Sequence, residues 1–482
     1  MNGSPAKPAS PGSRAEFTSR EDAVENIDAS CRVLLLPILG ALVWLVLSSG
    51  LALITSVKLH SPAILSHCAW LSYGHTRPAA NDAFVYGFAS QAGLAVALWM
   101  LCRLGRTTLV GVLPVAIASL FWNLGVALGL VGIFSGHTTG FDWLEFPVAG
   151  SAILFAAYAV LGICALLTFQ ARRTAELFPS QWYILAALLW FPWLYTTARL
   201  LLVWFPVRGV AQLAVSGWFS NGLFTLWLGS LALAVLFYFI PKFSHAPLHS
   251  RTLAVIGFWT LAVFGGWAGF YPGLPLPAWI ISVGIAGTVV LLVPLLATVL
   301  NLWLTLGAAN GTPSPLLGFF KTSLIFFALS GVFAVFAATV PQLRLTLFGE
   351  GLEQLTLYGF VGLALFGAIH HLAPRLTGIS SNKFIALNCW ATLLGLVIYA
   401  GALILGGVLQ QKKLINGLVP FVDVMNATKP FIRISTLGLV LLLIGNLALL
   451  LRVLSLLVAW ARVCFPSCCH PSAKLKPAEA TR

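Results

Sequence analysis

Charged residues are scarce in this chain. Only 8% of its 482 residues are Asp, Glu, Lys or Arg, whereas 59% are hydrophobic, and the mean hydropathy is +0.95. A soluble domain carries about 25% charged residues, so the composition excludes an ordinary water-soluble fold. Apolar runs of about 20 residues, long enough to cross a bilayer, recur along nearly the whole chain. In lipid such runs must be helical, because an open strand leaves backbone groups without hydrogen bonds.

Acidic residues are especially few: 13 stand against 27 Lys and Arg, which gives a net charge of +14. An excess of this size is also found in proteins that bind nucleic acid. Here, however, the basic residues crowd the ends of the apolar runs, where Lys and Arg fix the topology of membrane proteins. The charge therefore predicts a lipid bilayer as the partner and no nucleic acid.

The eight cysteines form no disulfide framework. Most stand singly in or beside apolar runs, where a free cysteine packs as a small hydrophobe. The only grouping is Cys464, Cys468, Cys469 and His470 near the C-terminus. It is a weak zinc site, because adjacent cysteines are poor joint ligands. We expect a juxtamembrane cysteine cluster without a metal.

The pattern predicts an all-α polytopic membrane protein, a single bundle of about twelve transmembrane helices. Residues 1–32 are polar and are predicted to form a mostly disordered cytoplasmic tail, with a short surface helix near Ser19–Ser30 and no cleavable signal peptide. Residues 33–460 form the membrane domain, and residues 461–482 form a second cytoplasmic tail. The expected spans centre on Leu34–Val57, Ala83–Leu101, Leu109–Phe134, Val148–Leu167, Trp182–Val203, Asn221–Ile240, Leu253–Phe270, Ile280–Leu302, Leu317–Val340, Leu355–His370, Ala386–Val408 and Ile434–Leu457.

The short loops predict the orientation. Cation-rich loops, such as the one with Arg103 and Arg106, alternate with loops nearly free of cations, such as the one around Gly136–Glu145. The cation-rich set belongs in the cytoplasm, so both termini are expected there. The loop that carries Lys412, Lys413 and Lys429 breaks the alternation, and we expect it to fold on the outer surface.

Several local motifs occur in a fixed order along the chain. They are Arg77-Pro78, then Thr139-Gly140 with Leu144-Glu145-Phe146-Pro147, then Phe237-Tyr238-Phe239-Ile240-Pro241-Lys242, Phe258-Trp259, Trp267-Ala268-Gly269, Phe366-Gly367-Ala368-Ile369 and Pro374-Arg375-Leu376. Each is weak alone. In this order, from Arg77 to the last span, they resemble subunit I of cbb-type cytochrome c oxidase, the C-family of haem–copper oxidases.

The resemblance implies the subunit I architecture, a bacterial inner membrane, and other membrane or cytochrome subunits in a respiratory assembly. It also implies cytochrome c oxidase activity in aerobic electron transport, with haem b and copper as cofactors. A family histidine that binds the low-spin haem falls at Ala80 or one of its neighbours, and the His-x-His pair of the tenth span falls at Leu352 and Gln354. The copper histidines fall at Asn221, Tyr271 and Pro272, and the family's crosslinked tyrosine falls at Gly265.

Neither Ala80 and its neighbours nor Leu352 and Gln354 are usual haem ligands, and no copper position holds a histidine. We therefore predict neither haem nor copper, no catalytic residue and a degenerate metal site. His370 and His371 lie too close to the cytoplasmic end of their span to replace the missing ligands, and we expect two interfacial histidines. Glu145 and Asp142 suit a hard cation, but a solvated loop is the favoured interpretation.

Four polar residues remain near the expected outer ends of spans: Asp82, Asn221, Glu353 and Gln354. Charged groups that face lipid are costly, so these residues either line a polar cavity or lie shallow enough to be hydrated. The cavity would be a former metal site now open to water, protons or a small solute.

Three functions follow from these observations. The first is a non-catalytic membrane subunit, a structural or proton-handling partner in a respiratory complex. The second is an active haem-binding oxidase or nitric oxide reductase with non-standard ligands. The third is a small-solute transporter or channel, although the sequence lacks the broken-helix repeats that often mark transporter sites.

Overall fold

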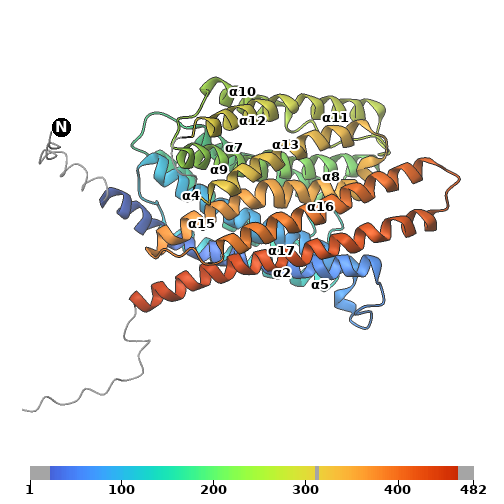
Figure 1. Ribbon diagram of the computed structural model, residues 1–482, viewed down its shortest axis with the longest axis horizontal. Helices are drawn as coiled ribbons and strands as arrows, with labels where there is room; N and C mark the ends of the chain where they lie inside the picture. The colour runs from blue at the N-terminus through green and yellow to red at the C-terminus, as the bar shows by residue number, and fades with distance from the viewer. Residues whose placement is uncertain (1–21, 310–313, 465–482) are drawn as a thin grey trace, which may run out of the picture.

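The structure is a computed structural model that describes residues 22–309 and 314–464 (Figure 1). Throughout these residues every regular element is a helix. The predicted all-α fold class is confirmed. The disordered tail predicted before Asp22 and the Cys468, Cys469 and His470 group lie outside the described residues. The domain boundaries at residues 32 and 460 stay predictions.

Eleven helices in the described part of the chain are long and apolar enough to cross a membrane. They span Asp22–His60, Tyr73–Gly105, Val112–Phe134, Val148–Gln170, Pro179–Trp204, Val210–Ser244, Ala278–Gly307, Leu317–Thr339, Leu347–Thr377, Ile385–Ile415 and Phe421–Cys464. Each corresponds to one of the runs expected from the sequence. The described chain begins and ends at the same end of the bundle, the left end of Figure 1.

The seventh predicted span is shorter than expected. Helix α10 runs from Arg251 to Phe264, only 14 residues, or about 21 Å at 1.5 Å per residue. The hydrocarbon core is about 30 Å thick. The chain continues to α11 (Ala278–Val290) without regular helix. Irregular backbone is tolerated at membrane depth only where protein or a cavity covers it, and residues 268–271 do line a cavity.

Three spans form the interior of the bundle. In Tyr73–Gly105, Val210–Ser244 and Leu347–Thr377, 83–100% of the most apolar window is buried inside the protein, against 33–50% in the other eight. Each of the three contains a wider, π-helical stretch. These are η3 (Ala83–Ser90), η5 (Leu223–Leu228) and η7 (Leu355–Gly362).

The π-helical stretches begin beside the polar residues singled out from the sequence. Asp82 immediately precedes η3, Gln354 immediately precedes η7, and Asn221 lies two residues before η5. π-bulges are frequent at functional sites. The three interior spans therefore place these polar residues where the helix geometry is altered.

Helices α16 (Ile385–Ile415) and α17 (Phe421–Cys464) form a long hairpin that reaches beyond the other helices (Figure 1). The loop expected around Lys412, Lys413 and Lys429 is therefore largely helical, and only residues 416–420 separate the two helices. The three lysines lie on helix extensions. Because these lysines do not lie in a short loop, they do not follow the alternation of cation-rich and cation-poor loops.

The residues just before α2 (Leu35–His60) pack against the bundle. The helix near Ser19–Ser30 is present from Asp22 onward, but its inner face is buried, with Cys31 and Leu34 fully enclosed. Asp28 accepts a hydrogen bond from the Trp99 indole at 3.0 Å. Its carboxylate also lies 3.6 Å from Arg103 and 3.3 Å from Arg375. This end of the bundle is thus held by one acid between two arginines.

Candidate functional site

A cavity of about 290 Å³ lies at the opposite end of the bundle from Arg103 and Arg375. We call it the large cavity. Its walls come from α8 (Val210–Gly222), η5, the segment 268–274, α13 (Leu317–Thr339) and α14 (Leu347–Gln354). One ordered water needs roughly 10–15 Å³ of such volume. The large cavity therefore has room for many water molecules or for a small solute.

An ion pair borders the large cavity. Arg344 lies in the 3₁₀ turn η6 (Leu343–Leu345) that precedes α14, and its Nη2 is 3.1 Å from Oε1 of Glu353. Both side chains are 24% exposed. The Tyr271 ring lies 6.0 Å from the same guanidinium. At this wall the positive charge of Arg344 is balanced by the carboxylate of Glu353 from the same chain.

Asn221 is occupied by local hydrogen bonds. Its amide Nδ2 donates to the Gly265 carbonyl at 2.8 Å, and its Oδ1 accepts from the Thr225 hydroxyl at 3.3 Å. The first bond holds the end of α10 against η5. Gly265 has no room for a larger side chain, because a Cβ there would lie 2.5 Å from Cδ2 of Leu226. The position that aligns with the family tyrosine is therefore filled by Leu226.

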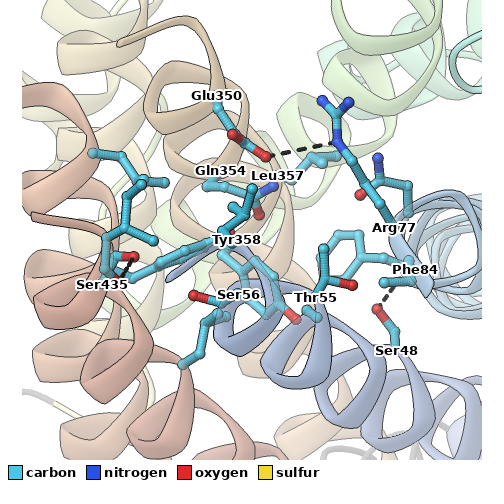
Figure 2. Close-up of a pocket in the computed structure, with 18 residues that line it drawn as sticks. Ser48, Thr55, Ser56, Arg77, Phe84, Glu350, Gln354, Leu357, Tyr358 and Ser435 are labelled. Atoms are coloured by element: carbon cyan, nitrogen blue, oxygen red, sulfur yellow. Dashed lines mark hydrogen bonds and ion pairs between the residues drawn. The ribbon is translucent and has the colours of Figure 1, made fainter. Parts of the chain in front are cut away.

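A second, smaller cavity of about 50 Å³ lies between α2, the Tyr73–Gly105 span, α14 with η7, α16 and α17 (Figure 2). We call it the small cavity. Arg77 and Glu350 approach each other across its rim at 3.8 Å. Deeper inside, the rings of Phe84 and Tyr358 pack with centroids 4.4 Å apart. These two rings fill much of the space between the helices.

The structure separates the residues that the sequence placed together. Asn221, Tyr271, Leu352 and Glu353 line the large cavity. Ala80 and Gln354 line the small cavity. Asp82 is fully buried and lines neither cavity, and Pro272 is also absent from both linings. The four residues expected around one polar cavity, Asp82, Asn221, Glu353 and Gln354, therefore lie in three different surroundings.

The residues present do not fit a haem–copper centre. Haem is usually held by His, Cys or Met, and in catalase by Tyr. Neither cavity lining contains His, Cys or Met. Tyr358 and Tyr399 line the small cavity, which at about 50 Å³ holds no porphyrin, because pockets for drug-sized ligands measure about 300–1,000 Å³. Tyr271 is the one tyrosine in the lining of the large cavity, and its ring lies against the Arg344 guanidinium. Among the described residues, no group of three or more His, Cys, Asp or Glu is arranged to hold a metal ion.

His370 and His371 lie away from both cavities. His370 was expected at the interface, but it is only 1% exposed. Its Nε2 lies 2.9 Å from Asn388 Oδ1, and its Nδ1 faces Arg452. His371 Nε2 lies 2.9 Å from the Lys242 Nζ, which sits among Trp99 and neighbouring aromatic rings. Both imidazoles are occupied by protein groups.

Glu145 differs from its expected place in a solvated loop. It is 5% exposed and lies beside Asp82, whereas Asp142 is exposed as predicted. Burial and the neighbouring Asp82 raise the pKa of the Glu145 carboxyl well above its usual range. Arg199, fully within the Pro179–Trp204 span, completes this buried group. Sequence reasoning missed Arg199, although an arginine inside an apolar run is itself a signal of a buried partner.

The two ion pairs at the cavities predict different mutant stabilities. Glu353→Gln leaves the Arg344 guanidinium without its partner in a partly buried wall, so we expect a loss of about 1–3 kcal/mol. Glu350→Gln is the matched control one helical turn away. The pair that it removes is longer, and Arg77 is 39% exposed, so we expect about 0.5 kcal/mol or less. Thermal unfolding in detergent compares the two, and equal losses would contradict the assigned geometry.

The comparisons with known proteins agree with this architecture. The family model for cytochrome c and quinol oxidase polypeptide I matches residues 32–441. A cbb3-type cytochrome c oxidase subunit CcoN1 from Stutzerimonas stutzeri is 25% identical, over 76% of this chain and 81% of its own length. A bacteroid cytochrome c oxidase subunit 1 homolog from Bradyrhizobium diazoefficiens is also 25% identical, over 77% of this chain and 71% of its own length.

A solved structure shares the fold. It is a heme-copper terminal oxidase dimer determined by cryo-EM, with a TM-score of 0.71 and 14% identity, and the match covers 88% of this chain and 84% of that one. The fold is thus that of a polytopic membrane subunit of the haem–copper oxidase superfamily. The chain belongs to the cytochrome c and quinol oxidase polypeptide I family. The resemblance found in the sequence motifs is confirmed.

Proposed function

We propose that this chain is a haem-free, non-catalytic member of its family that serves as a structural and proton-handling membrane subunit of a respiratory complex. The observation that carries the proposal is the lining of the two cavities. Five of the six positions that align with haem and copper ligands line these cavities, yet the linings offer no imidazole or thiol donor. Oxygen reduction needs a route for electrons through haem to a haem–copper pair, and this interior supplies no ligands for one.

The charges around the cavities support the same conclusion. Haem carries two anionic propionates, which need cationic or hydrogen-bonding partners inside a protein. Arg77 and Arg344, the arginines that line the two cavities, already face Glu350 and Glu353. A propionate would have to displace a carboxylate that the chain itself provides. Carboxylates of this protein thus neutralise the arginines without a bound cofactor.

Two positions near the copper site of the family, Asn221 and Gly265, are likewise occupied by contacts within the protein. Asn221 uses both ends of its amide within the protein, and Leu226 fills the space beside Gly265. Amide oxygen is also a poor donor for copper, which prefers imidazole and thiolate or thioether ligands. These contacts stabilise the junction of α10 and η5 in place of a metal.

The assembly and its location are proposed from the relatives. Two of them are described as subunits or subunit homologs of bacterial cytochrome c oxidases. We place this chain in the bacterial inner membrane with both termini in the cytoplasm, beside other membrane or cytochrome subunits. The large cavity would then open toward the outer side and carry water or protons.

Oxygen uptake tests the proposal. The purified protein, supplied with a reduced artificial electron donor in an oxygen electrode, is expected to consume no oxygen above the rate of protein-free detergent. The Stutzerimonas relative, expressed and purified in the same way, is the positive control. Uptake by this chain that cyanide abolishes would overturn the proposal and favour a haem-binding oxidase with non-standard ligands.

Solute transport is a second candidate, favoured by the volume and polar lining of the large cavity. A transport site in the large cavity would use Glu353 and Asn221. Uptake of labelled solutes into liposomes, abolished by Glu353→Gln and retained by Glu350→Gln, would support this candidate. Equal uptake of the labelled solutes by the wild-type protein and both variants would count against this candidate.

A further inference from the structure

A second polar centre lies behind the wall of the large cavity. Asp82 ends α3 (Tyr73–Asp82), and Glu145 lies in the turn before α6 (Val148–Gln170). Their carboxyl groups are close neighbours. Both are more than nine-tenths buried, with side chains enclosed by protein. Trp143, two residues before Glu145, lines the large cavity.

Three of the four carboxyl oxygens of this pair lack a hydrogen-bond partner. They are both oxygens of Asp82 and Oε2 of Glu145, and all three are buried. An unpaired buried charge is among the most costly features in a protein. A single proton placed between the two groups turns one of them into a donor. It thereby creates the hydrogen bond that both carboxyl groups lack.

The surrounding charges fit one proton. Arg199 contributes a positive charge from α7 (Pro179–Arg199), and its Nη2 is occupied by the Tyr195 hydroxyl at 3.2 Å. With one shared proton the pair carries one negative charge, which Arg199 balances. If both carboxylates were ionised, the pair would carry two negative charges in contact with each other, and Arg199 could balance only one of them. The titratable and charged groups that face the pair are Arg199, Tyr86, Tyr195 and Asp142.

We propose that Asp82 and Glu145 form a proton-binding site, a buried carboxyl pair that holds one proton at neutral pH with Arg199 as the balancing cation. The site does not depend on the absence of haem, so it stands or falls apart from the proposed function. The Tyr86 hydroxyl, which donates to the Trp143 carbonyl at 2.6 Å, anchors the turn that positions Glu145. The pair lies next to Asp142 and the large cavity, from which a proton would enter.

Infrared difference spectroscopy on the full-length protein in lipid nanodiscs tests the site. A carboxylic acid absorbs at a frequency distinct from that of a carboxylate, and the band shifts in D₂O. We expect such a band at neutral pH in the wild-type protein and its absence in the double variant Asp82→Asn/Glu145→Gln. Each single variant should shift or remove the band, because each removes the hydrogen-bond partner. Asp142→Asn, the exposed neighbour, should leave it unchanged.

Three results would overturn the proposal. The first is the absence of an acid band from the wild-type protein at neutral pH, which needs no variant to fold. The second is a band that neither single variant alters. The third is a band that appears only after treatment with a chelator, which would identify the pair as a cation site.

Stability against pH gives an independent measurement. The pKa of Glu145 is raised in the folded protein, so above a pH of about 4.5 the folded state binds more protons than the unfolded chain. The free energy of unfolding therefore falls as pH rises from there toward the folded pKa. Glu145→Gln should flatten this fall relative to Asp142→Asn. An identical pH profile for the two variants would contradict the proposal.

Discussion

Arg452→Ala is expected to lower the free energy of unfolding by about 3 kcal/mol or more, because it removes a buried cation that several buried acceptors share. Arg452 is 2% exposed. Its Nη2 donates to the Ser381 carbonyl at 2.9 Å, and its Nη1 donates to the His370 carbonyl at 3.2 Å. The same guanidinium faces the His370 imidazole. Removing it leaves two carbonyls and a ring nitrogen without a donor.

The expected loss extends through a chain of contacts. The other nitrogen of His370, Nε2, lies 2.9 Å from Asn388 Oδ1, and Asn388 Nδ2 donates to the Gly445 carbonyl at 2.8 Å. This network ties α15 (Leu363–Thr377) to both helices of the hairpin. Arg462→Ala is the matched control, because Arg462 is exposed on the same helix. Thermal unfolding in detergent should separate the two variants clearly. The account of this network fails if they unfold at the same temperature.

Gly395→Leu is expected to lower the free energy of unfolding by about 3 kcal/mol, the upper end of the 1–3 kcal/mol typical of overpacking. A Cβ at this position would lie 2.8 Å from the Gly438 carbonyl oxygen and 2.9 Å from the Leu442 amide nitrogen. Both obstacles are backbone atoms of α17, which cannot turn aside. Small residues at such crossings let membrane helices approach closely.

Gly401→Leu provides the control for this prediction. Gly401 lies on the same helix, yet a Cβ there meets no other atom within 4 Å. We expect Gly401→Leu to keep the wild-type yield of monodisperse protein in size-exclusion chromatography, while Gly395→Leu loses most of it. Similar yields from the two variants would show that α16 and α17 do not cross as described.

The sequence predicted the bundle well because the signals for membrane helices are local. Run length, hydropathy and flanking cations predict a span without knowledge of its neighbours. Eleven spans were found in this way. The seventh predicted span, Leu253–Phe270, was predicted too long, since hydropathy continues past Phe264 while the helix ends there. The end depends on Asn221, which binds the Gly265 carbonyl from another span.

The candidate site was harder to predict because burial and pairing are not local. Glu145 follows a polar loop, so nothing in its own segment indicates that its side chain is buried beside Asp82. Asp82 and Gln354 both occur at the start of an interior π-helical stretch, but they face different surroundings. His370 resembles an interfacial residue until Arg452 is placed beside it from α17. Such partners are separated by tens of residues and meet only in the folded bundle.

The central claim is that a haem–copper oxidase scaffold retains its helices without the groups that bind haem and copper. Haem and copper content of the purified full-length protein tests it most directly. Expression in a host that loads the Stutzerimonas relative with its cofactors gives the positive control. The account predicts no Soret or α band and no copper above the buffer in this chain. Sharp Soret and α bands with stoichiometric haem bound to the protein would contradict it.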